Sequence, residues 1–426
     1  MNPTYSRKIQ HLQESATIAI STLARELKAQ GKNILSFSAG EPDFDTPNAI
    51  KEEAKKALDS GFTKYTAVAG IPELKDAIVK KLKKDNGLDY TPKEILVSNG
   101  AKQSLFNVFQ AIIDEGDEVI IPAPYWVTYP ELVAYSGGKS VIINTDSASG
   151  LKITPTQLKN AITPKTKALV LTTPSNPTGM VYSRRELEEI NAVLKGTNIW
   201  IIADEIYEKL IYDGEFCSVG AIDSASLERT ITINGLSKSV AMTGWRMGYL
   251  ACKDAKLVKM MDNLQSQCTS NINSITQKAA IVALNGSVDK DIETMRGAFK
   301  NRRDIACARI EKIAGLSVLK PQGSFYLFID INGVGATKPN LKISGDSNAD
   351  FGGDSSGGFD KMAGDFGGSF GKVDSMEFCK QLLESQGVAL VPGSAFGAEG
   401  FVRMSFACKE EQILEGLERI ERFINS

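Results

Sequence analysis

Short runs of apolar residues alternate with segments of helical spacing through the first three quarters of the chain, and this alternation limits the chain to one class of fold. Val, Ile and Leu follow one another in most of these runs, which is typical of strands buried on both faces of a parallel sheet. Helical segments between and beside such strands predict an α/β domain with a mostly parallel sheet. The predicted strands are Glu94–Ser98, Glu118–Pro122, Val141–Thr145, Ala168–Thr173, Ile199–Asp204, Thr230–Asn234 and Met247–Cys252. The predicted helices are Ala49–Asp59, Pro72–Lys84, Lys102–Ile113, Arg185–Lys195 and Asp254–Gln267.

The last part of the chain has a different organisation. Two long helical stretches, near Ser274–Leu284 and Asp291–Ala314, follow the last of these strands. The segments Leu316–Phe328 and Val388–Ala407, with a closing helix from Glu410, then predict a smaller α/β domain. We place the seam between the two domains at Lys300–Asn301, inside a long helix.

Composition excludes several function classes. The chain has 426 residues, with 49 Lys and Arg against 51 Asp and Glu, so it lacks the basic excess of a nucleic-acid binder. Its one histidine, His11, argues against histidine-activated nucleophiles and histidine-rich metal sites. None of the six cysteines forms a C-x-x-C pair, no signal-peptide core follows Met1, and no apolar run is long enough to span a membrane. We therefore expect a cytoplasmic protein that binds neither a metal, nor nucleic acid, nor a membrane.

One glycine-rich segment stands apart from both predicted domains. Residues 333–373 hold 11 of the 37 glycines, and we expect a mobile insertion, because such a stretch buries too little apolar area to offset its ordering entropy. Within it, Asp346–Asp350 resembles the start of a calcium loop, but Phe351 and Gly357 stand where that loop needs Gly and Glu. A flexible loop that takes no part in the reaction is the expected interpretation, and part of a lid is the alternative.

Two further motifs carry no support. Gly137–Ser140 resembles the end of a phosphate-binding P-loop, but Val133 occupies the position of its first glycine. No G-x-G-x-x-G follows a strand, so a dinucleotide site is not predicted.

Two clusters of residues directly follow predicted strands, where α/β proteins bind their ligands. Ser98–Gln103 places Gly100 and Ala101 at a helix start that favours an anion such as phosphate, and Lys102 opposes the helix dipole unless it meets that anion. Pro174–Gly179 forms a rigid turn that would hold Asn176 at the end of a strand. A plain turn remains the alternative in each case.

Two further clusters hold charged residues on apolar flanks. Asp204 ends a strongly apolar strand, where a carboxylate is unfavourable without a partner; a helix cap or a structural ion pair is the alternative. Lys238 and Arg246 lie eight positions apart between two apolar strands. Burial lowers the pKa of a lysine and makes it nucleophilic, and arginine suits a phosphate; a solvated basic loop is the alternative.

Together the four clusters suggest pyridoxal phosphate (PLP). Its aldehyde needs a lysine, for which Lys238 is the candidate, and its ring nitrogen needs a carboxylate, for which Asp204 is the candidate. Its phosphate needs backbone donors and an arginine, which the Gly100 turn and Arg246 supply. Its ring needs an aromatic platform, and Trp126 is the candidate.

At this point the chain is identified as similar to a known family. It resembles the class I aminotransferases of PLP fold type I, and among them the bacterial aspartate aminotransferases, over nearly its whole length except the glycine-rich insertion. The resemblance rests on motifs in the same order and spacing: Ala39–Phe44, Lys64–Thr66, Pro124–Trp126, Pro174–Gly179, Asp204–Tyr207, Ser237–Lys238, Thr243–Arg246 and Val402–Ser405.

The resemblance implies a fold and a domain arrangement. It implies an α/β, fold type I PLP-dependent transferase, in which a mostly parallel mixed sheet flanked by helices forms the large domain. A smaller α/β domain is built from both chain ends. The implied boundaries are 1–47 for the N-terminal segment of the small domain, 48–300 for the large PLP-binding domain and 301–426 for the rest of the small domain, with the insertion at 333–373.

The resemblance also implies a role for each site residue. Lys238 would hold the aldehyde and move the proton, Asp204 would pair with the ring nitrogen, and Tyr207 and Asn176 would bond the ring hydroxyl. Trp126 would stack on the ring, and Arg403 would bind the substrate α-carboxylate. The remaining implied contacts are Gly100, Ala101, Lys102, Ser237 and Arg246 with the cofactor, Gly40 over the substrate, and Tyr65 with the phosphate of the neighbouring subunit. The last contact makes a homodimer part of the site.

The implied reaction is a ping-pong transfer of the amino group of L-aspartate to 2-oxoglutarate, which gives oxaloacetate and L-glutamate. In the resembling subgroup the side-chain carboxylate is bound by a lysine that Lys102 matches. Gln13 stands where prephenate-using members have a basic residue, which argues against prephenate. The alternatives are an aminotransferase for aromatic amino acids, alanine or prephenate, a PLP-dependent lyase or synthase, and a PLP-binding regulator.

Overall fold

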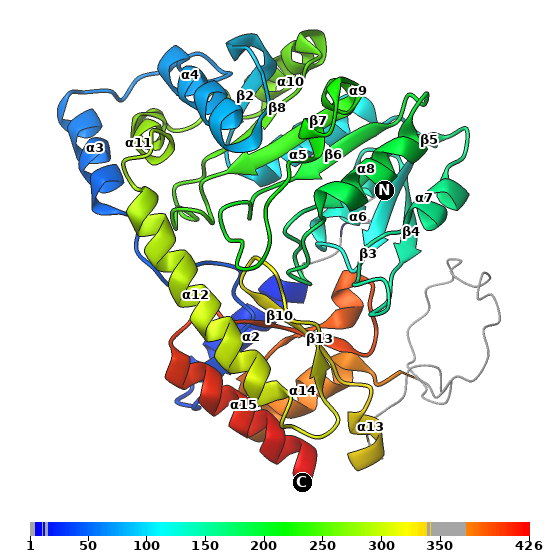
Figure 1. Ribbon diagram of the computed structural model, residues 1–426. Coiled ribbons are helices and arrows are strands. Elements are labelled where there is room, and N and C mark those ends of the chain that lie inside the picture. Colours follow the sequence, from blue (N-terminus) through cyan, green and yellow to red (C-terminus); the bar gives the residue numbers. More distant parts are fainter. Residues whose placement is uncertain (1–4, 11, 13–15, 339–340, 342–371) are drawn as a thin grey trace, which may run out of the picture.

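Residues 5–10, 12, 16–338, 341 and 372–426 are described in the computed structural model (Figure 1). The calcium-like segment Asp346–Asp350, most of the glycine-rich insertion, His11 and Gln13 lie outside the described residues.

The main sheet has seven strands in the order β2-β8-β7-β6-β5-β3-β4. Strand β8 runs antiparallel to β2 and β7, and the other neighbours are parallel, so the predicted mostly parallel mixed sheet is confirmed. The strands are β2 (Ile95–Ser98), β3 (Glu118–Ala123), β4 (Lys139–Asn144), β5 (Thr166–Thr172), β6 (Trp200–Asp204), β7 (Thr230–Gly235) and β8 (Gly248–Ala251).

Helices cover both faces of this sheet. Alternate strand residues point to opposite faces, so Val170 and Ile202 pack on one side while Leu169 and Ile201 pack on the other. This double burial explains the continuous apolar runs. One face is covered by α5 (Ala101–Ile112), α6 (Thr128–Tyr135) and α10 (Ala255–Cys268), and the other by α7 (Pro155–Ala161) and α8 (Arg184–Leu194). Helices α3 (Asn48–Asp59), α4 (Pro72–Lys81) and α11 (Ser274–Leu284) pack beside β2 and β8.

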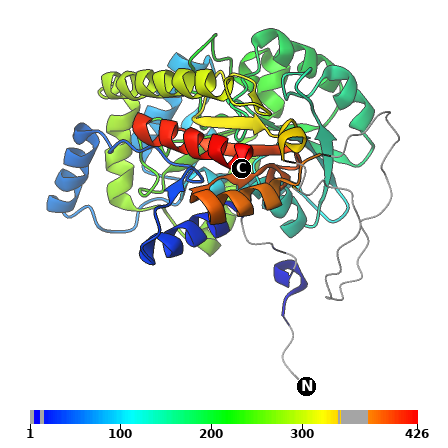
Figure 2. The same cartoon turned by 90° about the horizontal axis from the view of Figure 1, so that it is seen from below.

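A second, smaller layer combines residues from both ends of the chain (Figures 1 and 2). Its antiparallel sheet has the order β12-β13-β10-β9, and β1 (Leu35–Ser36) pairs in parallel with β11 (Val388–Ala389). The long helix α12 (Asp289–Ile310) runs from the first layer to the second and contains the predicted seam at Lys300–Asn301. The domain boundaries themselves remain predictions.

The remaining elements of the second layer have the following bounds. They are α2 (Ala16–Ala29), β9 (Ser317–Val318), β10 (Tyr326–Asp330), α13 (Val334–Thr337), α14 (Ser375–Gln386), β12 (Val391–Pro392), the 3-10 turn η4 (Gly393–Phe396), β13 (Phe401–Ser405) and α15 (Glu410–Asn425). Elsewhere are α1 (Arg7–Gln10), α9 (Ser224–Arg229), the π-helical turn η1 (Leu82–Asn86) and the 3-10 turns η2 (Pro92–Glu94) and η3 (Val219–Ala221).

The expected insertion is wrong at its two ends. Val334–Thr337 forms helix α13, and Val334 and Val373 are both buried in the core of the second layer. Each supplies one apolar side chain to a core that the composition of the segment as a whole does not reveal.

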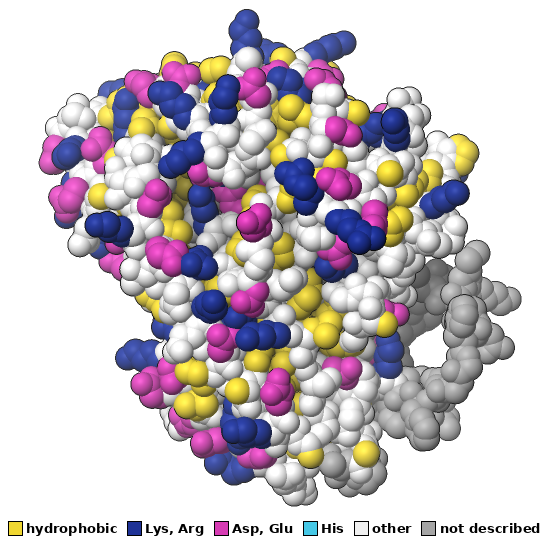
Figure 3. Space-filling model, in the orientation of Figure 1, with side chains coloured by type: hydrophobic (Ala, Val, Ile, Leu, Met, Phe, Trp, Pro, Cys, Tyr) yellow, Lys and Arg dark blue, Asp and Glu magenta, His cyan; other side chains and the backbone are white. Residues whose placement is uncertain are grey.

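The surface and the helices give two further observations. On the face seen in Figure 3, cationic and anionic side chains are interspersed, in keeping with the near balance of their numbers. Among the described helices, none is both long and apolar enough to cross a membrane.

Candidate active site

A cavity of about 640 Å³ opens at the carboxyl ends of the central strands, between the two layers. Every predicted site residue except Gly100 and Tyr65 lines it: Gly40, Ala101, Lys102, Trp126, Asn176, Asp204, Tyr207, Ser237, Lys238, Arg246 and Arg403. These residues come from points of the chain as far apart as Gly40 and Arg403, so the fold brings the four sequence clusters to one place.

Asp204 ends β6 and lies at the bottom of this arrangement, 4% exposed. Its carboxylate accepts a hydrogen bond from the Tyr129 hydroxyl at 2.7 Å and one from the Ile206 amide at 3.3 Å. No ion pair to Asp204 occurs among the described residues, which excludes the structural salt bridge that its position allowed. Burial raises the pKa of this carboxyl group, while Tyr129, Ile206 and the charge of Lys238 act in the opposite direction. A cationic ring nitrogen in the cavity would supply the missing partner.

Lys238 lies in the loop between β7 and β8, and its Nζ donates a hydrogen bond to the Gly40 carbonyl at 2.5 Å. Burial lowers the pKa of its amine to about 8; Arg246 and Arg403 add to this, and the carboxylate of Glu41 and that of Asp204 oppose it. A larger fraction of this amine is therefore neutral near pH 8 than of an exposed lysine. A neutral amine is the form that attacks a carbonyl carbon.

The start of α5 and the guanidinium of Arg246 form a candidate anion site. The first N–H groups of a helix have no acceptor within the helix, and Gly100 precedes Ala101 at this end with a φ of 83°. A Cβ at Gly100 would lie 2.6 Å from an Arg246 guanidinium nitrogen, so glycine there leaves room for the arginine to lie over the helix start. Arg246 donates to the Thr243 carbonyl at 2.9 Å and pairs with no carboxylate among the described residues.

Arg403, on β13 of the second layer, is a buried cation with a free donor. It is 2% exposed, and its Nη atoms donate to Asn176 Oδ1 at 3.0 Å and to the Ser38 carbonyl at 2.8 Å, while its Nε has no partner. Its guanidinium lies between the rings of Tyr326 and Phe396, 4.4 and 5.0 Å from their centroids. A buried cation that faces a cavity without a carboxylate partner suits a carboxylate ligand.

Aromatic groups surround the space between these charges. Trp126 packs edge-on against Tyr129, and the Lys102 ammonium lies 5.0 Å from the centroid of its ring. The Tyr207 hydroxyl lies 3.0 Å from that of Tyr326. Burial, followed by the charge of Arg246, lowers the pKa of Lys102.

Several residues of the cavity are not predicted from the sequence. Tyr129, on α6, donates a hydrogen bond to Asp204, and Tyr326, on β10, contacts Tyr207. The Tyr326 hydroxyl also lies close to Gly40, because a Cβ on that glycine would be only 2.8 Å from it. Glu41 follows the predicted Gly40, and Arg25 lies on α2; both line the cavity. Neither tyrosine has a sequence signal, because each stands in an apolar pattern that burial alone explains.

Tyr65 lies outside the cavity of its own chain. It is 90% exposed, in the segment between α3 and α4. Its predicted contact with a neighbouring subunit remains a prediction.

The donors of this cavity fit PLP. An amine of lowered pKa, an unpaired buried carboxylate, an anion site made by a helix start with an arginine, and an indole platform occur together, as that cofactor requires. Arg403 and Lys102 line the same cavity, and neither pairs with a carboxylate among the described residues. No group of three or more metal-ligating side chains occurs in the described part of the chain.

Comparison with known proteins gives consistent results. The family model for aminotransferases of class I and II matches residues 32–420. The chain is 44% identical to an aspartate aminotransferase of Bacillus sp. (strain YM-2) over 100% of both chains, and 42% identical to a probable aspartate/prephenate aminotransferase of Aquifex aeolicus over 99% of both. Its structure is similar to that of the aspartate aminotransferase of Thermus thermophilus with maleate, with a TM-score of 0.87, 39% identity and coverage of 99% of this chain and 100% of that one.

Proposed function

The chain belongs to the class I and II aminotransferases, and from this premise we propose that it transfers the amino group of L-aspartate to 2-oxoglutarate with PLP as cofactor. One observation carries the proposal: Arg403 and Lys102, two cations without a carboxylate partner among the described residues, line the same cavity as the amine of Lys238. Two carboxylates on either side of an amino group are what aspartate and glutamate offer.

Each residue has a role in holding the cofactor. Lys238 Nζ would bind the aldehyde carbon, and Asp204 would face the ring nitrogen and keep its proton. Tyr207 and the amide nitrogen of Asn176 would bond the ring hydroxyl, since Asn176 Oδ1 already accepts from Arg403. Trp126 would stack on the ring. Gly100, Ala101, Ser237 and Arg246 would surround the phosphate, with Lys102 beside it and facing the substrate.

The reaction then divides between the cofactor and the chain. When bound, PLP supplies a carbon that takes the amino group and a ring that accepts electrons from the substrate Cα. Arg403 would bind the α-carboxylate and orient the Cα proton toward Lys238, and Gly40 would lie over the substrate. Lys238 Nζ would move that proton between the substrate Cα and C4′ of the cofactor. The same site would then serve the 2-oxo acid in the reverse sense, which makes the cycle ping-pong.

We also propose a homodimer in which Tyr65 of one subunit reaches the phosphate site of the other. Its exposure in a single chain and its place in the Lys64–Thr66 motif support this arrangement.

A second candidate amino acceptor is prephenate, because the Aquifex relative carries that activity in its name. Gln13, the residue that argues against it, lies outside the described residues.

An absorption titration tests the proposal. The purified protein with PLP is expected to show the visible band of lysine-bound cofactor, to lose it with aspartate and to regain it with 2-oxoglutarate. If only an aromatic amino acid, alanine or prephenate with glutamate passes through this cycle, the aspartate assignment is wrong. Loss of the amino acid without stoichiometric transfer would indicate a lyase, and absence of the band in excess PLP would contradict the role of Lys238.

A further inference from the structure

The end of β6 and the turn that follows it carry two of the proposed cofactor contacts and lie between two cavities. Asp204, Ile206 and Tyr207 line the large cavity, whereas Glu208 and Lys209 line a second cavity of about 210 Å³. Apolar packing holds one side of the turn, because Ile206 and Tyr207 belong to the core of the second layer. Glu205 and Glu208 are also buried, and carboxyl groups cannot be held by apolar packing, so polar contacts must fix the other side.

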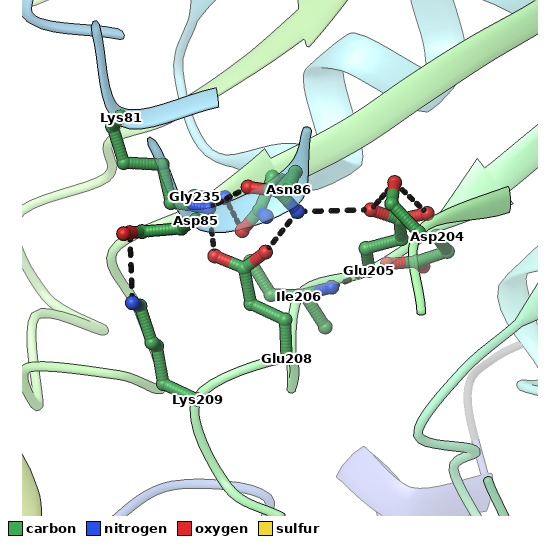
Figure 4. A network of polar contacts seen from close by, with 11 residues as sticks. Lys81, Asp85, Asn86, Asp204, Glu205, Ile206, Glu208, Lys209 and Gly235 are labelled. Carbon is green, nitrogen blue, oxygen red and sulfur yellow. Dashed lines mark hydrogen bonds and ion pairs between the residues drawn. The ribbon is translucent and has the colours of Figure 1, made fainter. Parts of the chain in front are cut away.

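A buried network of side chains supplies these contacts (Figure 4). Lys81 of α4 forms an ion pair with Glu208, and both side chains are almost completely buried. Lys81 Nζ also donates to Asn86 Oδ1 at 2.7 Å, and Asn86 Nδ2 donates to Glu208 Oε2 at 2.6 Å. The three side chains therefore close a ring of contacts between η1, the end of α4 and the turn.

Glu205, at the start of the turn, is held by a second set of hydrogen bonds. Its carboxyl group, which is fully buried, accepts from the Ser218 hydroxyl at 2.7 Å and from the Val219 amide at 2.9 Å, and Asn86 Nδ2 lies 3.4 Å from it. Successive residues of an extended strand point to opposite sides, so Glu205 reaches away from the cavity into which Asp204 points. Asp204 therefore faces the cavity, whereas its neighbour Glu205 bonds the protein on the opposite side of the strand.

Burial of this network is unfavourable in itself. Burial raises the pKa of Glu205 to about 8, the bonds from Ser218 and Val219 lower it, and the charge of Glu208 raises it. The charge of Lys81, which faces both carboxyl groups, also lowers the pKa of Glu205. Apolar side chains of similar size stabilise a fold as well as or better than a buried ion pair, whereas a satisfied polar network selects one arrangement of the chain.

We propose that Glu205 and Glu208 are positioning residues of the reaction: through Lys81, Asn86 and Ser218 they hold the turn in the one arrangement that aims Asp204 and Tyr207 at the cofactor. The inference rests on the proposed function, because it assumes that PLP contacts Asp204 and Tyr207. It assigns no contact with substrate or cofactor to either glutamate.

Two variants and one matched control test it. Glu208→Gln removes the charge that pairs with Lys81, and Ser218→Ala removes a hydroxyl whose acceptor is Glu205. The control is Glu94→Gln, since Glu94 is also buried and pairs with Lys253 at 2.9 Å but lines neither cavity. The measurements are the melting temperature without PLP, the dissociation constant of PLP from the visible band, and the pH midpoint of that band.

We expect all three variants to melt earlier than the parent protein. Only Glu208→Gln and Ser218→Ala are expected to raise the dissociation constant of PLP, by about tenfold or more, the size of loss that follows removal of a residue orienting a metal ligand. Both should also move the pH midpoint of the band, because Asp204 and Tyr207 would meet the ring at altered positions. Ser218→Ala, the milder change, decides the matter if Glu208→Gln does not fold.

Two results would overturn the inference. Unchanged PLP affinity and midpoint in both variants, at a lowered melting temperature, would reduce the network to a support of the fold. An equal change in Glu94→Gln would show that loss of any buried pair disturbs the site. Absence of the band in the parent protein is a separate result, read first, and it contradicts the proposed function itself.

Discussion

At the scale of single residues, the lowered pKa of Lys238 has a direct kinetic consequence. An amine attacks an aldehyde only when it is neutral, and burial brings the pKa of this amine to about 8. The rate at which the apo protein takes up PLP is therefore expected to rise with pH to a midpoint near that value, followed by stopped-flow absorbance. Glu41→Gln should move the midpoint to lower pH, because the Glu41 carboxylate raises the pKa of this amine. A midpoint near that of an exposed lysine would show that the amine is not desolvated.

Lys102 gives a prediction about substrate choice. Lys102→Met is expected to lower kcat/KM for aspartate by about 10- to 100-fold, the range of one charge-assisted hydrogen bond, and to affect alanine and phenylalanine much less. The exposed lysine Lys159 supplies the matched control as Lys159→Met. An equal loss for all three amino acids would assign Lys102 to the cofactor phosphate instead of the side-chain carboxylate.

The residues that sequence reasoning finds and misses differ in their chemistry. Lys238, Asp204 and Arg246 are conspicuous because a charge on an apolar flank needs an explanation. Tyr129 and Tyr326 are not, because an aromatic side chain in an apolar segment is explained by burial alone. Their hydroxyls become functional only through Asp204 and Tyr207, which lie far from them in the sequence.

At the scale of elements, the start of α5 gives the third prediction. Gly100→Ala would force a Cβ to within 2.6 Å of the Arg246 guanidinium, so the arginine must leave the helix start. We expect PLP affinity to fall by about tenfold or more, because the anion site loses the guanidinium of Arg246, as measured by titration of the visible band.

The control for this change is Gly196→Ala. Gly196 also has a positive φ, 79°, but a Cβ there meets no atom within 4 Å. The control should therefore lower the melting temperature and leave PLP binding unchanged. If both variants bind PLP equally well, the contact between Gly100 and Arg246 has no part in the anion site.

Strands and helices follow from the sequence to different degrees. All seven predicted strands form the main sheet, with ends displaced by no more than a few residues, because burial on both faces leaves a strong apolar signal. Helix α2 is not predicted: it contains the β-branched Thr17, Ile18, Ile20 and Thr22, which disfavour helix, and its apolar Ile18 and Leu23 are exposed. Its buried stripe of Ile20, Ala24 and Leu27 is short and packs in a small cluster, so it gives only a weak signal among the exposed apolar residues.

At the scale of the whole molecule, the cavity exists only where the two layers meet. Asp204 ends a strand of the main sheet and Lys238 lies in a loop between two of its strands, whereas Gly40, Tyr326 and Arg403 come from the second layer. Their convergence depends on the pairing of β1 with β11 and on the course of α12, which are long-range contacts that local sequence patterns do not encode. The family resemblance predicts that these residues meet in one cavity, whereas the hydrophobic periodicity predicts only the individual strands and helices.

The proposed homodimer gives the last prediction. Lys238→Ala removes the amine of a site, and Tyr65→Ala removes a side chain that the same chain would lend to its partner's site. In a hybrid of the two variants, both defects fall on one site and leave the other intact. The two variants, each of low activity alone, are unfolded together and refolded in equal amounts. Half of the resulting dimers are hybrids with one intact site, so about a quarter of the parent activity is expected.

Joint refolding of Lys238→Ala with Asp204→Ala is the control. Both of these changes lie in the cavity of their own chain, so each site of such a hybrid carries one of them. Activity that stays at the level of the separate variants in the Tyr65 mixture would mean that Tyr65 serves its own chain or no site at all.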